Sequence, residues 1–431
     1  MGAENPQREE SGLRMRRRNI QWIAPMILVS GVVVLLTWGN LVFTRANPGG
    51  NDFLVHWMGA RMFITQGVSP YSDETAIEIQ KFAYGRPARP GEHELRVAYP
   101  FYSIFVFLPF SLIPDYPIAR ALWMTLLEAG LIALSFISMR LVNWRPPPWV
   151  LASFLVFSLL WYHGARPLIN GNVVILIALG FVGALLAIRF RADELAGVLM
   201  ALTTIKPQLS LVFSIYLVFI ALVQRRWKFI FWFFGTLLLL ILVSMLLLPD
   251  WVVQNLSEIL HYPGYNPPGT LQAALKVWFP VFGNRLGWGI TGFLGLLLLV
   301  EWRFSGKAEY RRILWVSCLT LTISQWIGIQ TDPGNFIILI PALVLILATL
   351  SERWRRVGNL VSIGVMAILL VGLWLLFLST VEFGYQPQQS PIMFLPLPGI
   401  LFVSLYWIRW WAIHPGSVLY TWHPDQDMNP S

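Results

Sequence analysis

Apolar runs of roughly 18 or more residues recur along this chain, long enough for a helix to cross the hydrocarbon core of a bilayer. Of the 431 residues, 56% are hydrophobic and only 12% are charged. A soluble domain typically carries about 25% charged residues. Inside lipid each backbone polar group needs a partner within the protein, and a helix supplies one. The sequence therefore predicts an all-α polytopic membrane protein.

The formal net charge of +9 does not indicate a nucleic-acid partner. The basic residues lie largely in short turns between apolar runs, where Lys and Arg determine topology. The sequence contains no zinc, Walker or dinucleotide motif that would favour another class. The single cysteine, Cys318, lies in an apolar run, and we expect a small buried hydrophobic side chain there.

The apolar runs predict about 12 transmembrane helices in one domain that covers residues 20–413. The candidate spans are 20–43, 99–113, 118–139, 149–161, 173–188, 195–223, 229–248, 286–300, 313–329, 336–350, 357–378 and 394–408. The sixth of them is broken at Lys206-Pro207. Residues 1–19 and 414–431 are then polar tails.

An arginine cluster, Arg14 and residues 16–18, directly precedes the first run. It predicts a cytoplasmic N-terminus and an uncleaved anchor, and an even number of spans puts the C-terminus on the same side. In this count the turns with Arg140 and Arg189 fall outside, against the usual excess of positive charge in the cytoplasm. An extra or missing span between residues 99 and 223 would remove the conflict.

Two outer loops are long, 44–98 and 249–283. In the first, the apolar residues after Asp52 recur at helical spacing, and Gly67 is a plausible helix stop. Such a helix would lie in the headgroup plane, with its apolar side toward lipid. For Asp52 two interpretations stay open. It either caps the helix or is a functional carboxylate at the membrane surface.

The order of several short motifs resembles glycosyltransferase family 87 (GT87), whose members are polyprenyl-phosphate-mannose-dependent mannosyltransferase-like proteins. The motifs are Asp52-Phe53, Trp57-Met58-Gly59-Ala60, Gly67, Pro70-Tyr71, Tyr99-Pro100, Gly171-Asn172 and Ile205-Lys206-Pro207. The resemblance covers roughly residues 50–210. The family often has Tyr-Pro-Pro where this chain has Tyr99-Pro100-Phe101, and Gly-Gln where it has Gly171-Asn172.

This resemblance implies a GT-C-type helical bundle with interfacial helices in the outer loops. It also implies a polyprenyl-phosphate sugar as donor, a glycolipid or glycan acceptor on the outer face of the cell membrane, and Asp52 as general base. An inverting displacement needs one carboxylate to take the hydroxyl proton. The leaving lipid phosphate needs cations or backbone donors.

Lys206 is the sharpest candidate for that phosphate, because a lysine inside an apolar run usually faces a cavity or a partner. A structurally paired lysine remains the alternative. The predicted substrate-binding residues are His56, Arg61, Tyr71, Asn172, Lys206, His261, Arg285 and Asp332. Asp332 also has a simpler interpretation as part of an Asp-Pro-Gly turn. The first outer loop holds no Asp-x-Asp pair, so we predict no metal and no other cofactor.

Two other functions compete with this prediction. A transporter or flippase for a lipid-linked sugar would show internal repeats and broken helices in matching halves, whereas this chain shows one break and no repeat. A polysaccharide polymerase or ligase would place its large outer loop late in the chain. The role of Glu128, inside a predicted span, stays open.

Overall fold

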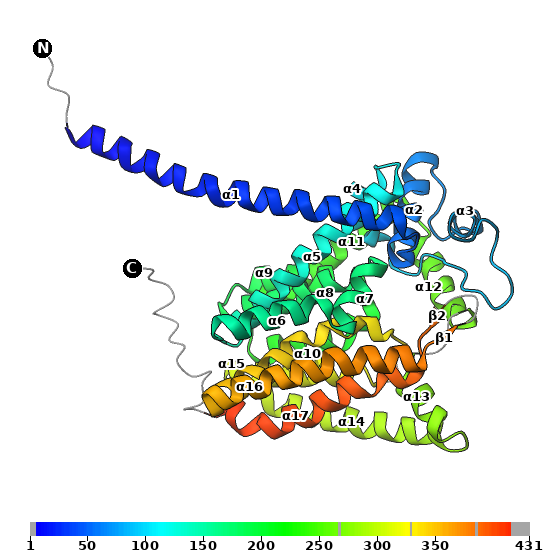
Figure 1. Cartoon of the computed structure of the whole chain (residues 1–431). Helices are drawn as coiled ribbons and strands as arrows, with labels where there is room; N and C mark the ends of the chain where they lie inside the picture. Colours follow the sequence, from blue (N-terminus) through cyan, green and yellow to red (C-terminus); the bar gives the residue numbers. More distant parts are fainter. Residues whose placement is uncertain (1–5, 266–268, 328–329, 384–386, 415–431) are drawn as a thin grey trace, which may run out of the picture.

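The computed structural model describes residues 6–265, 269–327, 330–383 and 387–414, and these are almost wholly helical (Figure 1). The helices, with η for short 3-10 helices, are α1 (Pro6–Ala46), α2 (Asn51–Gln66), α3 (Asp73–Tyr84), η1 (Phe101–Ser103), α4 (Ile104–Ser111), α5 (Tyr116–Leu141), α6 (Pro148–Leu160), α7 (Tyr162–Asn170), α8 (Val174–Arg189), α9 (Asp193–Thr203), α10 (Pro207–Val223), α11 (Trp227–Leu247), α12 (Trp251–His261), η2 (Tyr262–Gly264), α13 (Leu271–Trp278), α14 (Gly283–Ser305), α15 (Tyr310–Ser324), η3 (Pro333–Leu339), α16 (Ile340–Thr380), η4 (Pro391–Phe394) and α17 (Pro396–Ile413). Two short strands, β1 (Glu382–Phe383) and β2 (Pro387–Gln388), form an antiparallel pair.

Six helices within these residues are long and apolar enough to cross a bilayer, which confirms a polytopic helical membrane protein. They are Pro25–Ala46, Tyr116–Leu141, Trp227–Leu247, Gly283–Ser305, Pro333–Thr380 and Pro391–Ile413. The pair α6 and α7, bent by 46°, adds a seventh if it acts as one span. The predicted count of 12 is therefore not confirmed, and two of the predicted spans do not cross.

The first of these is 99–113. Its helix α4 has eight residues, a rise of about 12 Å where a crossing needs about 30 Å. The indole N–H of Trp57 on α2 donates to the carbonyls of Phe110 and Ile113 at 3.1 and 3.3 Å. The hydroxyl of Tyr116, where α5 begins, donates to the carbonyl of Gly49 at 2.7 Å. The apolar residues of α4 thus pack against α2 at one end of the bundle.

The second is 195–223. The predicted break at Lys206-Pro207 is confirmed, because α9 ends at Thr203 and Pro207 begins α10. However, Nη2 of Arg226, just after α10, lies 3.5 Å from Oδ1 of Asp193 at the start of α9. Since both ends of the segment meet, α9 and α10 form a hairpin that enters the bundle and returns. Hydropathy detects the apolar stretch but not its change of direction.

With these two crossings removed, the basic turns gather at one end of the bundle. Nη1 of Arg189 donates to the carbonyl of Arg140 at 2.9 Å. Arg226 donates to the carbonyl of Ile188 at 2.9 Å, and the hydroxyl of Tyr310 donates to that of Leu185 at 3.1 Å. The turns that conflicted with the expected charge distribution therefore lie beside the other arginine-rich turns.

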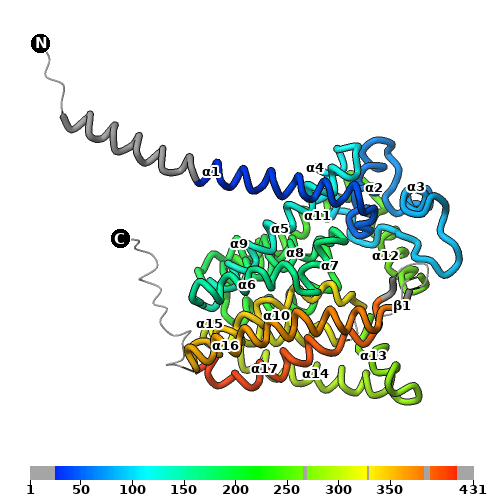
Figure 2. The backbone as a smooth tube through the Cα atoms, in the orientation of Figure 1, coloured from blue at the N-terminus to red at the C-terminus, as the bar shows by residue number. Residues whose placement is uncertain are grey.

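Helix α1 starts at Pro6, so part of the predicted 1–19 tail is helical. It runs antiparallel to α5: Thr44 donates to the carbonyl of Pro117 at 3.0 Å, and Nδ2 of Asn40 donates to Oε2 of Glu128 at 3.0 Å. Glu128 therefore accepts a hydrogen bond that joins two helices. The C-terminal end of α1 lies beside α2 at one end of the bundle (Figures 1 and 2).

Helix α16 confirms a prediction of two helical segments, 336–350 and 357–378. The backbone at Arg355 is non-helical, with φ 46° and ψ −114°, and the chain reverses there. The hydroxyl of Ser362 reaches the carbonyl of Leu347 at 3.5 Å, so the two limbs lie side by side. The first limb is buried, and the second has a largely exposed face.

Helix α2 ends where predicted, with Gly67 at φ 71° as its cap. Its apolar side does not face lipid as predicted, because Phe53 and Trp57 are buried within the protein. Gly50 at φ 76° precedes the helix, and a Cβ there would lie 2.4 Å from Nε of Arg120. This close approach packs the start of α2 against α5.

Candidate active site

Four polar side chains from distant parts of the sequence form one hydrogen-bonded chain. Nδ2 of Asn172 donates to Oδ2 of Asp52 at 2.9 Å. Nζ of Lys206 donates to Oδ1 of Asn172 at 2.9 Å and to Oδ1 of Asn335 at 2.7 Å. We call Asp52, Asn172, Lys206 and Asn335 the amide network. It joins α2, the α7–α8 turn, the tip of the α9–α10 hairpin and η3.

Asp52 does not cap its helix. Gly50 occupies the cap position, and no side-chain cap hydrogen bond is formed. Asp52 lies in the first turn of α2, where the helix dipole favours a negative charge. Its Oδ2 is held by Asn172, and within the described chain no hydrogen bond reaches Oδ1. The simple capping interpretation is thus excluded.

Desolvation raises the pKa of the Asp52 carboxyl above its usual range. The positive charge of Lys206 is the largest opposing effect, and the negative charge of Asp332 adds to the increase. Arg166 and the hydrogen bond from Asn172 lower the pKa again. The carboxylate is therefore more basic than an ordinary aspartate yet remains close to two cations, as suits a group that accepts a proton.

Asn172 owes its position to the glycine before it. Gly171 ends α7 with φ 70°, and a Cβ there would lie 2.5 Å from Cβ of Phe53. Its carbonyl accepts the indole N–H of Trp123 at 2.8 Å. The backbone N–H of Asn172 then bonds the carbonyl of Pro167 at 2.7 Å, which completes the cap of the helix. Any side chain at position 171 would push α2 away from this turn.

Lys206 is 3% exposed and Asn335 is 2% exposed. Beside its two amide acceptors, Nζ of Lys206 lies 5.4 Å from the centre of the Tyr99 ring. That ring stacks on His56 with 4.1 Å between the centroids. The carbonyl of Tyr99 accepts the hydroxyl of Tyr71 at 2.7 Å. The motifs that resemble the family thus converge around one lysine.

A polar turn from the second half of the chain forms another wall of the site. Oδ1 of Asp332 accepts the backbone N–H of Gly334 at 2.6 Å, as a turn residue would. Oδ2 of Asp332 lies 3.8 Å from Nη2 of Arg166 and accepts from Gln389 at 3.2 Å. Asp332 therefore has a turn role and also faces the site.

Arg166 and Asn335 are the site residues that the sequence did not reveal. Arg166 lies in α7, and its buried Nε has no hydrogen-bond partner in the described ranges. Its guanidinium also lies 5.8 Å from the centre of the Phe377 ring. An arginine between two apolar runs was a usable signal. Asn335 gave none beyond its proximity to a predicted turn.

Two predicted substrate-binding residues on α2 bond to or stack on groups other than Asp52. His56 is buried between Tyr99 and Phe107, and burial followed by the charge of Lys206 lowers its pKa to about 3. It is therefore neutral at physiological pH. Arg61 donates to the carbonyl of Ser111 at 3.1 Å. Nine residues of helix separate Arg61 from Asp52, about 13 Å along the axis.

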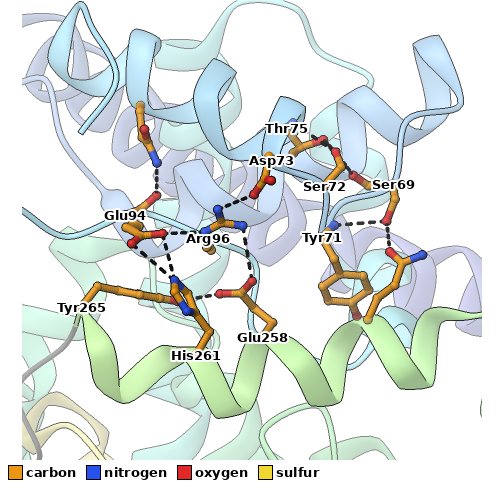
Figure 3. A network of polar contacts seen from close by, with 12 residues as sticks. Ser69, Tyr71, Ser72, Asp73, Thr75, Glu94, Arg96, Glu258, His261 and Tyr265 are labelled. Carbon is orange, nitrogen blue, oxygen red and sulfur yellow. Dashed lines mark hydrogen bonds and ion pairs between the residues drawn. The ribbon is translucent and has the colours of Figure 1, made fainter. Parts of the chain in front are cut away.

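His261 belongs to a second polar group between the first outer loop and α12 (Figure 3). Nε of Arg96 bonds Oε2 of Glu94 at 2.7 Å, and its Nη1 lies 3.6 Å from Oε2 of Glu258. Nε2 of His261 lies 3.3 Å from Oε2 of Glu94. We call Glu94, Arg96, Glu258 and His261 the loop clamp. Arg285 lies elsewhere, on α14, beside an open apolar hollow lined by Phe282.

The fold and the site define a multi-pass helical membrane protein with a single carboxylate held by an amide at one end of its bundle. The model of glycosyltransferase family 87 matches residues 98–326, more than half of the chain. The chain belongs to glycosyltransferase family 87 and is a membrane glycosyltransferase, as the motif order indicated. No curated protein and no solved structure matches it. Asp52 and Asn335 lie outside the matched residues, whereas Asn172 and Lys206 lie within them.

Proposed function

We propose that this protein transfers mannose from a polyprenyl-phosphate donor to a hydroxyl of a glycolipid or glycan acceptor, with inversion and with Asp52 as general base. The observation that supports this most is the state of the Asp52 carboxyl. One oxygen is fixed by Asn172, and the other has no hydrogen-bond partner among the residues described. Such a group can accept a proton without breaking the contact that orients it.

In the proposed reaction the acceptor oxygen forms a bond to C1 of the sugar while its proton moves to Oδ1 of Asp52. The bond from C1 to the phosphate oxygen breaks, and its electron pair leaves with the lipid phosphate. A positioned base of this kind contributes about 10²- to 10⁴-fold. One carboxylate suffices, unlike the paired acids of glycosidases.

The leaving phosphate needs a cation, and Arg166 is the best placed. Its nearest ion-pair partner, Asp332, is 3.8 Å away, so its planar donors are not consumed by a close pair. Lys206 already gives two hydrogen bonds to amides. Arg61, His261 and Arg285 contact other parts of the molecule. The phosphate therefore lies at Arg166 in this proposal.

The distribution of basic turns supports an outer location for the site. The arginine-rich turns meet at the C-terminal end of α5, away from α2 (Figure 1), and such turns are typical of the cytoplasmic side. Helix α1 begins at this end because it is antiparallel to α5, and α17 finishes there, where the carbonyl of His414 accepts from Arg311 at 2.9 Å. Both termini are then cytoplasmic in the cell membrane.

The reaction as proposed uses no metal and no other cofactor. The donor is a monoanionic phosphodiester whose lipid phosphate leaves as a dianion, a charge that Arg166 can stabilise, and the base is already present in Asp52. A flippase remains the alternative, supported by the broken α9–α10 hairpin, since transporters build ligand sites at broken helices. The two functions differ in whether a glycosidic bond forms.

The test uses proteoliposomes with polyprenyl-phosphate mannose labelled in the sugar and a membrane-lipid extract as acceptor. We expect labelled glycolipid from the wild type and from Glu78→Gln, a control at an exposed carboxylate of α3. Asp52→Asn should give almost none. Full activity of Asp52→Asn would remove the general-base role. Movement of intact labelled donor across the membrane, without a new bond, would favour the flippase.

A further inference from the structure

Asn172 lies between a carboxylate and a cation, and its amide must present the right atom to each. Its Oδ1 accepts from the backbone N–H of Val174 at 3.0 Å as well as from Lys206. Because two donors reach the Asn172 oxygen, the Nδ2 group must face Asp52, whose carboxylate accepts its hydrogen bond. The orientation of this amide is therefore determined by its partners.

Lys206 has little capacity left for a substrate phosphate. Its ammonium group has three N–H bonds; two point to the Oδ1 atoms of Asn172 and Asn335, and the Tyr99 ring lies beside it. A phosphate oxygen would have to displace one of the two amides. With 3% exposure the side chain also lies behind the network, away from an entering ligand.

We infer that Lys206 is a positioning residue that fixes the Asn172 amide, so that Asn172 Nδ2 holds Asp52 Oδ2 and leaves Asp52 Oδ1 to take the acceptor proton. This inference rests on the proposed function of Asp52. Asn335 holds Lys206 from the far side, and its own Nδ2 donates to the hydroxyl of Thr331 at 2.9 Å. The turn before η3 thereby supports the base through three intervening side chains.

The inference separates the roles of the two cations at the site. Lys206 acts on Asp52 through an amide, and Arg166 lies 3.8 Å from Asp332, outside the amide network. Removal of a positioning residue changes the chemical step more than the binding of the donor. A misplacement of a reacting group by about 1 Å can reduce a rate roughly 100-fold.

The first experiment compares kcat and KM for the labelled donor in Lys206→Met, with Lys81→Met as a matched control at an exposed lysine of α3. We expect kcat of Lys206→Met to fall about 10- to 100-fold while KM changes less than about threefold. The control should match the wild type. A rise of KM with unchanged kcat would overturn the inference and make Lys206 a phosphate ligand.

The second experiment tests whether Lys206 acts through Asp52. Once Asp52 is replaced by Asn, adding Lys206→Met should reduce the remaining activity by less than about twofold, because the residue that it positions is gone. Independent, multiplying losses would contradict a shared role. Asn172→Ala should behave as Lys206→Met does, since the first removes the donor to Asp52 and the second removes the group that fixes this donor.

A third measurement does not need enzymatic activity, so it also holds if the proposed function fails. Carbodiimides modify protonated carboxyls, and mass spectrometry can follow labelling of Asp52 against pH.

The charged and titratable groups that act on Asp52 are Lys206, Arg166, Asp332, Tyr99, Tyr116 and Tyr262. Loss of the Lys206 charge and of the Asn172 hydrogen bond both favour the protonated acid. The labelling midpoint should therefore move to higher pH in Lys206→Met and Asn172→Ala and stay unchanged in Lys81→Met. An unmoved midpoint in Lys206→Met would refute the inference.

Discussion

The amide network and the loop clamp both join segments that are far apart in the sequence, but they are built differently. In the loop clamp, acids and bases meet directly, and Arg96 contacts Glu94 and Glu258. In the amide network, Asn172 separates the acid Asp52 from the base Lys206. Direct pairs neutralise each other and stabilise the fold. An interposed amide orients a carboxylate and leaves it able to accept a proton.

The two groups also show that the exposure of a charged side chain does not indicate whether it belongs to the candidate active site. His261 of the loop clamp is accessible and lies near Glu94, and the sequence predicted it as a substrate-binding residue from its place in the second outer loop. Lys206 and Asn335 are almost fully buried, yet they connect to Asp52 through the amide of Asn172. A charged group next to a membrane surface is thus a weak indicator of a site, and a buried polar chain with one unoccupied acceptor is a stronger one.

The largest effect should come from Asp52→Asn, which breaks the amide network at its functional end. We expect kcat to fall about 10²- to 10⁴-fold, because the acceptor hydroxyl loses its base. Folding raises the pKa of this carboxyl, so its contribution to stability is present at low pH and is lost as the pH rises through the folded pKa. At pH 7 the charged group therefore opposes folding.

The thermal midpoint of Asp52→Asn at pH 7 should accordingly equal or exceed that of the wild type. Differential scanning fluorimetry in detergent measures it beside the transfer assay. A variant that loses activity and also melts well below the wild type would indicate a structural role for Asp52.

The second effect concerns Arg166, the cation outside the amide network. Arg166→Gln should lower kcat/KM for the lipid donor roughly 10- to 100-fold, because a charge-assisted hydrogen bond contributes about 1.5–3 kcal/mol. Arg166→Lys keeps the charge and should recover part of the loss. Transfer at several donor concentrations measures both. Equal kinetics of Arg166→Gln and wild type would assign the phosphate to another group.

The third effect is a pH dependence that distinguishes Asp52 from His56 on the same helix. The activity should fall about tenfold for each pH unit below the pKa of Asp52, which desolvation places above the usual aspartate range. His56, with a pKa of about 3, stays neutral there and cannot produce this limb. The profile of His56→Gln should keep the acidic limb of the wild type. Its disappearance in that variant would contradict the assignment.

A smaller effect is expected from the loop clamp. Arg96→Gln should lower the free energy of unfolding by about 1 kcal/mol, since partly exposed pairs contribute little. The activity should change less than about threefold, because Asp52 is positioned by other residues. Chemical denaturation and the transfer assay check the two parts. A loss of activity as large as that of Lys206→Met would mean that the clamp also positions the base.

The smallest effect should be that of a chelator. Incubation with EDTA should leave the rate unchanged, since Asp52 and Arg166 carry the proposed reaction without a metal. The control is the addition of Mg²⁺ or Mn²⁺ after chelation. Inactivation by EDTA with recovery on adding a metal would refute metal independence.

The sequence predicted the all-helical membrane class, α2 and the break at Pro207, because composition, caps and proline act locally. It could not give the direction of each apolar segment, so 99–113 and 195–223 were taken as crossings. The arginines in conflict with that count placed the error between residues 99 and 223, and both segments lie there. The expected excess of positive charge in cytoplasmic turns thus indicated which part of the predicted topology was wrong, whereas hydropathy gave no such indication.

For the site, the order of motifs indicated that Asp52, Asn172 and Lys206 belong together. The contacts that bring Asn335 and Arg166 to the site depend on the packing of helices that lie more than a hundred residues apart in the sequence. The contact of Asn172 with Lys206 also depends on helix packing. Neither is encoded in a local pattern. Lys206 was predicted as a phosphate ligand, with a structurally paired lysine as the alternative, and the structure gives it two amide partners.

In the α9–α10 hairpin, the lengths of the two helices determine how far Lys206 lies from the base of the hairpin. Its base is fastened where Arg226 meets Asp193 and Lys228 meets Glu194. From there α9 rises through 11 residues and α10 descends through 17. Deleting one residue from either arm would draw the tip down by about 1.5 Å and turn it by about 100°. The lengths of the two arms are therefore held to the same tolerance as the reacting groups they support.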